Sequence, residues 1–430
     1  MFYAEVRLRD AGCVICAGVE QAYTNTCIYI SCAGRLSARY VWCPTEERSV
    51  VSLHLFGSAC LKESLESMMD KDMTLQNVIE MILDLARWAP SGDNTQPWRF
   101  EIKGSGHVVV HGHDTRAHCV YDLDGHPSQL SLGALLETMA IAASAHGLST
   151  STRRRLDMPE ANPTFDVFFQ TDSRVARDPL LSFIPLRSVQ RRPMSMRALT
   201  RQEKARVEAA AGNDYEILWL EGFGTKLRTA LLMFHNAKLR LTMPEAYQVH
   251  RDVIEWDARY SEDRIPDQAL GVDALTARLM RFVMQSWQRV EFFNTYLAGT
   301  WMPRIQMDFI PGMACAAHFV IKARKPPATI DDYIAAGRTV QRVWLTLTQL
   351  GLALQPEMTP LIFSSYVRNG IKFTRSDKLL VQAESLAASF TNLTGNDVAN
   401  AVFMARTGES AAPKSRSTRL SLKRLLDLRG

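Results

Sequence analysis

The pattern of apolar positions is irregular over the first seventy residues and becomes regular from about residue 72 onward. Between residues 75 and 85 apolar side chains recur at helical spacing, which predicts a helix. Pro90 ends that helix, because a proline disfavours the α conformation of the residue before it. The further elements predicted up to residue 170 are paired strands over 98–102 and 108–111, a buried helix over 130–146 and a strand over 165–169.

The second half of the chain again mixes helices and strands. Its helix over 331–350 ends in Gly351-Leu352, as the helix over 130–146 ends in Gly147-Leu148. Glycine is favoured where a helix ends in a left-handed residue, and the repeated ending suggests an internal duplication. The elements predicted in this half are helices over 199–211, 222–241, 244–260, 275–301 and 331–350, and strands over 215–220 and 401–406.

Composition bounds the class of protein. The chain has 430 residues, of which 47% are hydrophobic and 22% charged, as in ordinary globular proteins of two to three domain-sized units. No apolar run reaches the ~18 residues that a membrane span needs, so we expect no membrane partner. We expect a cytoplasmic protein with reduced thiols, because residues 1–20 do not have the pattern of a secretory signal.

Six of the eight cysteines fall in the first 60 residues. Cys13 and Cys16 have a spacing found in metal sites, but zinc sites show better-defined cysteine pairs at set separations. We therefore interpret residues 1–71 as a poorly defined, cysteine-rich extension and expect no metal. The two readings, a poorly packed extension and a zinc module, both remain open from the sequence.

The net charge of +5 is concentrated at the end of the chain, where residues 414–430 hold six basic residues and one acidic residue. A local cationic segment indicates a local anionic partner. A phosphate group fits better than a nucleic acid duplex, because the rest of the chain is close to neutral.

A loop rich in polar residues, held between Pro90 and Pro97, follows the first helix. It is either a polar turn or a wall whose amides and N–H groups meet a flat heteroaromatic ligand. The loop resembles the Pro-Ser-x-x-Asn-x-Gln-Pro-Trp signature of the nitroreductase family, which binds flavin mononucleotide (FMN). The resemblance assigns five loop residues to the cofactor: Pro90, Ser91, Gly92, Asn94 and Gln96.

Two basic motifs complete the candidate site. Arg187, Ser188 and Arg191 form a compact cationic loop that is either a solvated surface cluster or a phosphate-binding segment. The loop resembles the Arg-x-Ser/Thr-x-Arg motif of nitroreductases, although Ser188 stands one residue early. Lys414 and Arg416 resemble the family's C-terminal phosphate clamp, and the alternative is a disordered basic tail.

The order of these motifs implies a fused pseudo-dimer. Residues 72–180 carry the Pro-Ser loop and residues 181–430 carry the basic motifs, so the two halves would share one FMN. The resemblance implies an α+β, nitroreductase-like fold, internally duplicated, with central, mostly antiparallel sheets flanked by helices. It also implies a monomer that is an intramolecular pseudo-dimer, with no nucleic acid partner.

The function that the resemblance implies is FMN-dependent oxidation and reduction. Hydride would pass from NAD(P)H through flavin N5 to a small, aromatic or quinone-like acceptor, with no catalytic side chain. Two alternatives stay open. One is a non-catalytic FMN-binding or sequestering protein whose site lies under a lid formed by residues 275–301, and the other is an interaction protein that keeps only the fold.

Overall fold

The computed structural model describes residues 2–7, 14–22, 25–32, 36–39, 75–104 and 106–428. The chain divides into two compact units, Met1–Met73 and Thr74–Gly430. In the first unit the described strands form one antiparallel sheet in sequence order: β1 (Phe2–Arg7), β2 (Val14–Ala22), β3 (Asn25–Cys32) and β4 (Leu36–Arg39). Cys13, one of the two residues on which the zinc reading rests, lies outside the described residues.

The first sheet of the second unit confirms the strands predicted between residues 98 and 169. It is antiparallel and has the strand order β5-β6-β8-β7. The helix before it, α2 (Leu75–Ala86), ends three residues earlier than the proline rule alone requires, and a turn leads from it to Pro90. The four strands are β5 (Trp98–Gly104), β6 (His107–Gly112), β7 (Leu148–Arg154) and β8 (Thr164–Thr171).

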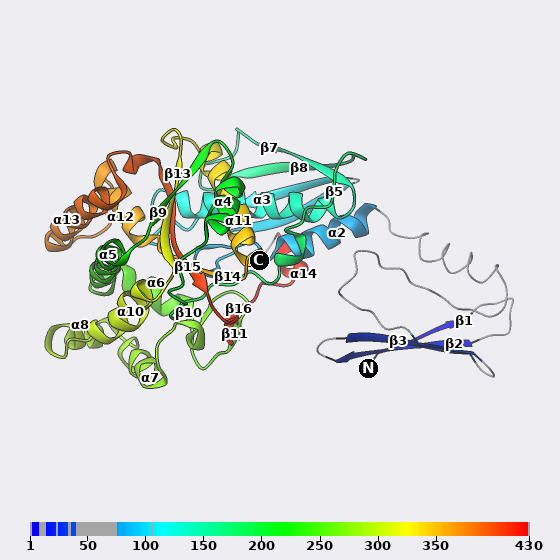
Figure 1. Ribbon diagram of the computed structural model, residues 1–430, viewed down its shortest axis with the longest axis horizontal. Coiled ribbons are helices and arrows are strands. Elements are labelled where there is room, and N and C mark those ends of the chain that lie inside the picture. The colour runs from blue at the N-terminus through cyan, green and yellow to red at the C-terminus, as the bar shows by residue number, and fades with distance from the viewer. Residues whose placement is uncertain are drawn as a thin grey trace. The chain divides into compact units, whose positions relative to one another are not determined.

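A second antiparallel sheet repeats this arrangement, with the strand order β9-β13-β15-β14. In each sheet the first two strands in sequence pair with each other, and the fourth strand lies between the second and the third. The two sheets therefore share one topology, and the fold is α+β (Figure 1). The strands are β9 (Tyr215–Leu220), β13 (Ala317–Ala323), β14 (Leu352–Pro356) and β15 (Ala401–Glu409).

Two long helices, α3 (His126–Ser144) and α11 (Ile330–Gln349), pack closely against each other. Their backbones approach at two glycines, since a Cβ added to Gly133 would lie 2.9 Å from the Cα of Gly337. Both helices end before a glycine with positive φ, 63° at Gly147 and 73° at Gly351, and each glycine leads directly into a strand. The repeated Gly-Leu ending thus has the same structural role in both halves.

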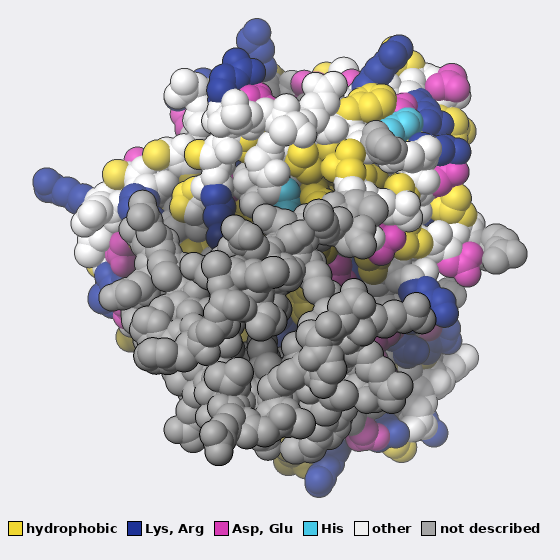
Figure 2. Space-filling view, turned by 90° about the vertical axis from the view of Figure 1, so that its right-hand side faces the viewer, with side chains coloured by type: hydrophobic (Ala, Val, Ile, Leu, Met, Phe, Trp, Pro, Cys, Tyr) yellow, Lys and Arg dark blue, Asp and Glu magenta, His cyan; other side chains and the backbone are white. Residues whose placement is uncertain are grey.

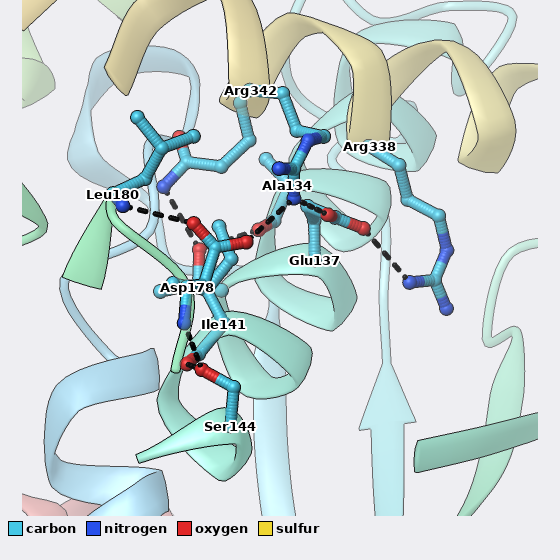
Figure 3. A network of polar contacts seen from close by, with 10 residues as sticks. Ala134, Glu137, Ile141, Ser144, Asp178, Leu180, Arg338 and Arg342 are labelled. Carbon is cyan, nitrogen blue, oxygen red and sulfur yellow. Dashed lines mark hydrogen bonds and ion pairs between the residues drawn. The ribbon is translucent and has the colours of Figure 1, made fainter. Parts of the chain in front are cut away.

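Ion pairs tie these helices together at their surface (Figure 3). Glu137 of α3 accepts from Arg338 at 3.3 Å and from Arg342 at 2.8 Å, both on α11. Arg342 also contacts Asp178, whose backbone N–H donates to the hydroxyl of Ser144 at 2.9 Å. Helices α3 and α11 are therefore joined by close backbone packing in the core and by charge pairs outside it.

Two helix predictions were wrong in extent. The helix predicted over 244–260 is α6 (Pro244–Val253), after which the chain becomes extended and forms β10 (Ile254–Glu255) and β11 (Tyr260–Ser261). The segment 275–301 is not one helix, because Ser286 caps a new helix and Ala298 has a φ of 51°. It divides into α7 (Ala274–Val283), α8 (Trp287–Tyr296) and α9 (Trp301–Arg304), followed by a π-helical turn (Ile305–Phe309) and α10 (Ile310–Met313).

Of the remaining helices, α4, α5 and α12 contact the second sheet, α13 packs on α5 and α12, and α14 contacts α2 and β5 of the first sheet. The sequence predicted α4 and α5, and it missed α12 and α13, which pack on each other. Among the described residues, no helix is both long and apolar enough to cross a membrane. The bounds are α4 (Arg201–Ala211), α5 (Phe223–Leu241), α12 (Thr359–Asn369), α13 (Asp377–Thr394) and α14 (Leu422–Leu426), with the short strands β12 (Ile265–Pro266) and β16 (Arg416–Ser417).

Candidate functional site

One cavity of about 420 Å³ brings together the loop after α2, the arginine-rich loop before α4 and the C-terminal segment around β16. These three segments are far apart in the sequence. Of the ten predicted site residues, Gln96 and Lys414 do not line the cavity. The eight that line it are Pro90, Ser91, Gly92, Asn94, Arg187, Ser188, Arg191 and Arg416.

The loop after α2 has an unusual backbone. Asp93, Asn94 and Gln96 have φ values of 48°, 64° and 48°, in the left-handed region that residues other than glycine seldom adopt. The hydroxyl of Ser91 accepts from the backbone N–H of Gln96 at 3.0 Å and so closes the loop on itself. Such backbone strain persists only where surrounding contacts hold it, and it is concentrated at functional sites.

The amide groups of Asn94 and Gln96 supply these contacts. Asn94 donates to the carbonyls of Glu262 and Arg264 at 3.0 and 3.3 Å. Gln96 donates to the carbonyl of Glu262 at 2.8 Å and accepts from the backbone N–H of Leu420 at 2.9 Å. Both side chains are buried, so their polar atoms join distant segments of the protein to the loop.

Three arginines, which we call the arginine trio, surround the backbone at the start of this loop: Arg187, Arg416 and Arg419. Arg187 donates to the carbonyl of Trp88 at 2.8 Å, and Arg419 donates twice to the carbonyl of Ala89, at 2.9 and 3.1 Å. The Arg416 guanidinium lies 5.1 Å from the Trp88 ring centroid. The trio therefore holds the residues that lead into the loop.

The trio concentrates positive charge where water is largely excluded. Arg187 is 2% exposed and Arg419 is 8% exposed, and among the described residues none of the three forms an ion pair with a carboxylate. The Nε atoms of Arg187 and Arg416 are buried without a hydrogen-bond partner. Burial, and then the charges of Arg419 and Arg416, lower the pKa of Arg187. An anion bound there would compensate these charges and accept these donors.

The basic residues of the C-terminal segment that line the cavity are Arg416 and Arg419, not the predicted pair Lys414 and Arg416. Lys414 is exposed, and the structure shows its backbone carbonyl accepting from Arg259 at 2.8 Å. Arg419, which the sequence analysis did not single out, lines the cavity and donates to Asn94 Oδ1 at 2.8 Å. The signal was present, since Arg416 and Arg419 stand three residues apart, but it could not be separated from the other basic residues of 414–430.

A second polar group, which we call the Arg240 cluster, lines another part of the wall. It contains Asp93 of the loop, Tyr121 between β6 and α3, Arg240 of α5 and Asp308 of the π-helical turn. The charges of Asp308, Tyr121 and Asp93 act on Arg240, whereas those of Arg416 and Arg419 act on Arg187. The sequence analysis missed this cluster because its members lie on four separate segments.

A buried chain of charges holds the predicted Arg191 in place. His318 Nδ1 and Glu357 Oε2 lie 2.6 Å apart, and Arg406 pairs with Glu357 Oε1 at 3.2 Å. Arg406 also donates to the carbonyl of Arg191 at 2.8 Å. Burial lowers the pKa of Arg191 to about 10, against the opposing effect of Asp93. Arg191 therefore stays charged at neutral pH and faces the cavity.

Five methionines lie in the apolar wall of the cavity, together with aliphatic side chains and the aromatic rings of Trp344 and Phe403. The aromatic residues of 275–301 do not line the cavity. Trp344 of α11 does, and its ring centroid lies 4.5 Å from the guanidinium of Arg187. The methionines of the wall are Met233, Met280, Met284, Met307 and Met358.

The basic side chains that line the cavity are closer together than those on the face of the protein drawn in Figure 2. On the face drawn in Figure 2, the described Lys and Arg side chains are dispersed among acidic and apolar ones. In the part of the chain that the structure describes, no group of three or more His, Cys, Asp or Glu residues is arranged to hold a metal ion. Inside the cavity, by contrast, the arginine trio and Arg191 bring positive charge together.

No protein-family model matches this chain. Over 316 residues, 69% of its length, the chain is 24% identical to an uncharacterized protein of Mycobacterium tuberculosis. The aligned part is 41% of that relative, so the chain spans about two fifths of the relative's length.

Proposed function

We propose that this protein binds FMN in the cavity and is an FMN-dependent oxidoreductase of the nitroreductase type. One observation carries the proposal: in a single cavity the strained loop that begins at Pro90 meets the arginine trio, of which Arg187 and Arg419 are buried and which has no carboxylate partner among the described residues. A buried cationic group next to a polar loop suits a ligand with a phosphate at one end and a flat polar ring at the other.

The shared topology of the two sheets supports a nitroreductase-like, internally duplicated fold. In this proposal residues 72–180 form one half and residues 181–430 the other. The first half contributes the loop and the second half contributes the arginine trio, as a chain that fuses the two subunits of a dimer would require. The close packing of α3 on α11 at Gly133 and Gly337 supplies the interface between the halves.

The residues present fit the cofactor. Arg187, Arg416 and Arg419 would bind the phosphate, and the two orphaned Nε atoms supply donors that the protein itself leaves unused. The cavity volume of about 420 Å³ lies in the range of about 300–1,000 Å³ that small-molecule sites occupy. Ser91 and Gly92 would lie against the ring, and Ser188 would add a hydroxyl.

Bound FMN would supply a two-electron carrier that accepts hydride from NAD(P)H and passes it to a small aromatic or quinone-like acceptor. The protein's own residues would bind the cofactor and hold it in a fixed orientation. The trio neutralises the phosphate, Asn94 and Gln96 keep the loop in its strained shape, and the methionine wall excludes water from the ring. Hydride transfer itself requires no nucleophilic side chain.

A second function, storage or sequestration of FMN without turnover, has one specific observation in its favour. Met280 of α7, Met284 directly after it and Met307 of the π-helical turn line the cavity. The segment 274–309 therefore covers part of the site, as a lid would. A covered flavin would be retained but would not meet NAD(P)H.

An absorption spectrum of the purified full chain, followed by anaerobic addition of NADH and NADPH, tests both functions. The proposal predicts flavin bands that bleach when one of the nucleotides is added. Flavin bands that persist would favour sequestration. A colourless protein that added FMN does not stabilise against heat would contradict both functions, since a tight ligand at a hundredfold excess over Kd stabilises by about 2.7 kcal/mol.

A further inference from the structure

The Arg240 cluster gathers proton-bearing groups around one guanidinium inside the cavity. Arg240 lies within the electrostatic reach of three of them: the carboxyls of Asp308 and Asp93 and the phenol of Tyr121. All four residues line the cavity, and the Arg240 side chain is only 18% exposed. In the proposed function the arginine trio already binds the phosphate. Arg240 and the three weak acids around it are therefore not needed for phosphate binding.

Asp308 is the least constrained of these acids. Its side chain is 8% exposed, and among the described residues the only hydrogen bond to its carboxyl comes from Arg240 Nη2, at a long 3.5 Å. It projects from the π-helical turn Ile305–Phe309, and such turns are rare and frequently occur at functional sites. The charges that face it are Arg240 of α5, Arg406 of β15, Glu357 after β14 and Arg304 of its own segment.

The other acids of the cluster are less suited to release a proton. The Tyr121 hydroxyl lies 2.7 Å from Nε2 of His250, and burial raises the pKa of Tyr121 far above neutral pH. Burial and the charge of Arg240 lower the pKa of His250 to about 3, so His250 stays neutral and can accept from Tyr121. Burial raises the pKa of Asp93 against the opposing charges of Arg191 and Arg240, but Asp93 is fixed in the strained loop, where its own φ is 48°.

We propose that Asp308 is the catalytic acid that protonates the acceptor during its reduction, an inference that rests on the proposed FMN-dependent function. A quinone-type acceptor takes up two electrons and one proton as hydride, and it needs one further proton to become the hydroquinone. The O–H bond of protonated Asp308 breaks and its proton goes to the acceptor oxygen. The carboxylate left behind is stabilised by Arg240 and takes a new proton from solvent.

The acidity of Asp308 agrees with this role. Burial raises its pKa to about 6, although Arg240 and Arg406 act in the opposite direction. A general acid is most effective when its pKa lies near the working pH, because it then holds a proton and can also release it. The rate of acceptor reduction should therefore fall as pH rises through about 6.

The test compares Asp308→Asn, Asp308→Glu and the surface control Asp263→Asn in the full chain loaded with FMN. Stopped-flow spectroscopy follows flavin reduction by NAD(P)H and reoxidation by 1,4-benzoquinone separately. We expect Asp308→Asn to slow reoxidation at least tenfold and to abolish its pH dependence, while FMN affinity and flavin reduction stay unchanged. Asp308→Glu should restore the pH dependence, and Asp263→Asn should match the wild type.

A second readout does not depend on turnover. Infrared difference spectra of wild type minus Asp308→Asn, recorded with and without FMN, should show one carboxyl that loses its proton near pH 6. Reoxidation of Asp308→Asn at the wild-type rate, or a carboxyl already ionised well below that pH, would overturn the role of Asp308. Absence of FMN binding in the wild type would instead overturn the proposed function, and this inference with it.

Discussion

Arg419 donates a hydrogen bond to Oδ1 of Asn94 at 2.8 Å, although 325 positions separate the two residues in the chain. The bond joins the C-terminal segment to the loop that follows the first helix. Asn94 also donates to the turn after β11, so one amide holds three segments together. The cavity exists because these distant segments are fixed to one another at this residue.

Replacing Asn94 with Ala should destabilise the protein and weaken FMN binding. The change leaves Arg419 without one acceptor and takes one of two side-chain donors from each of the carbonyls of Glu262 and Arg264, and a hydrogen bond to a charged group contributes roughly 1.5–3 kcal/mol. Urea unfolding should show a loss of about 3 kcal/mol. Asn213→Ala, at an exposed asparagine outside the cavity, is the control, and an equal effect of both changes would contradict the role of Asn94.

Replacing Arg416 with Gln should weaken FMN binding about ten- to a hundredfold, since a charged hydrogen bond of ~1.5–3 kcal/mol is lost. Lys414→Gln removes the same charge two residues away, at an exposed side chain, and should change the Kd for FMN little. Fluorescence titration measures both values. If the two variants bound FMN equally well, the phosphate would not lie at the arginine trio.

The contact between α3 and α11 predicts that Gly133→Ala is severely destabilising. The new Cβ would lie 2.1 Å from the carbonyl oxygen of Ile334, so the helices must separate, and overpacking of this kind costs about 1–3 kcal/mol or more. Gly224→Ala is the matched control, because its Cβ would meet nothing within 4 Å. Thermal unfolding should place Gly133→Ala well below the wild type and Gly224→Ala close to it.

The pair His318 and Glu357 predicts a loss of stability in alkali. Burial lowers the pKa of His318, but the charge of Glu357 more than offsets this effect and raises the pKa to about 10. Because the folded protein holds this proton more tightly than the unfolded chain, the pair stabilises fully below about pH 6.5 and progressively less as pH rises to about 10.

Urea unfolding over that pH range measures the effect. Glu357→Gln should lower stability near neutral pH by about 3–5 kcal/mol, because Arg406 and His318 lose their buried partner, and it should remove the decline above neutral pH. Glu216→Gln, at a surface pair with Arg324, should leave the pH dependence intact. A wild-type protein equally stable across the range would contradict the assignment.

The compact motifs of the candidate site could be recognised in the sequence, whereas their long-range contacts could not. Pro90, Ser91, Arg187 and Arg416 belong to compact motifs, and eight of the ten predicted residues line one cavity. The part played by Asn94 and Gln96 could not be predicted, because their partners lie more than 160 positions away. A periodic pattern of apolar residues indicates which face of a helix or strand is buried, but not which other segment of the chain packs against that face.

The same limit explains the residues that the sequence analysis missed. Arg240 and Asp308 lie on helical segments where isolated charged residues are ordinary, and they become a cluster only in three dimensions. Elements with a clear period, such as β9 and α11, were predicted to within one residue at each end.

The affinity of the flavin-free protein for FMN and for riboflavin, compared by fluorescence titration, tests the central claim most directly. The two ligands share the ring and differ only in the phosphate. If the arginine trio binds that phosphate, FMN should bind about ten- to a hundredfold more tightly, and added salt should narrow the difference. Equal affinities, or no binding of either ligand, would contradict the account.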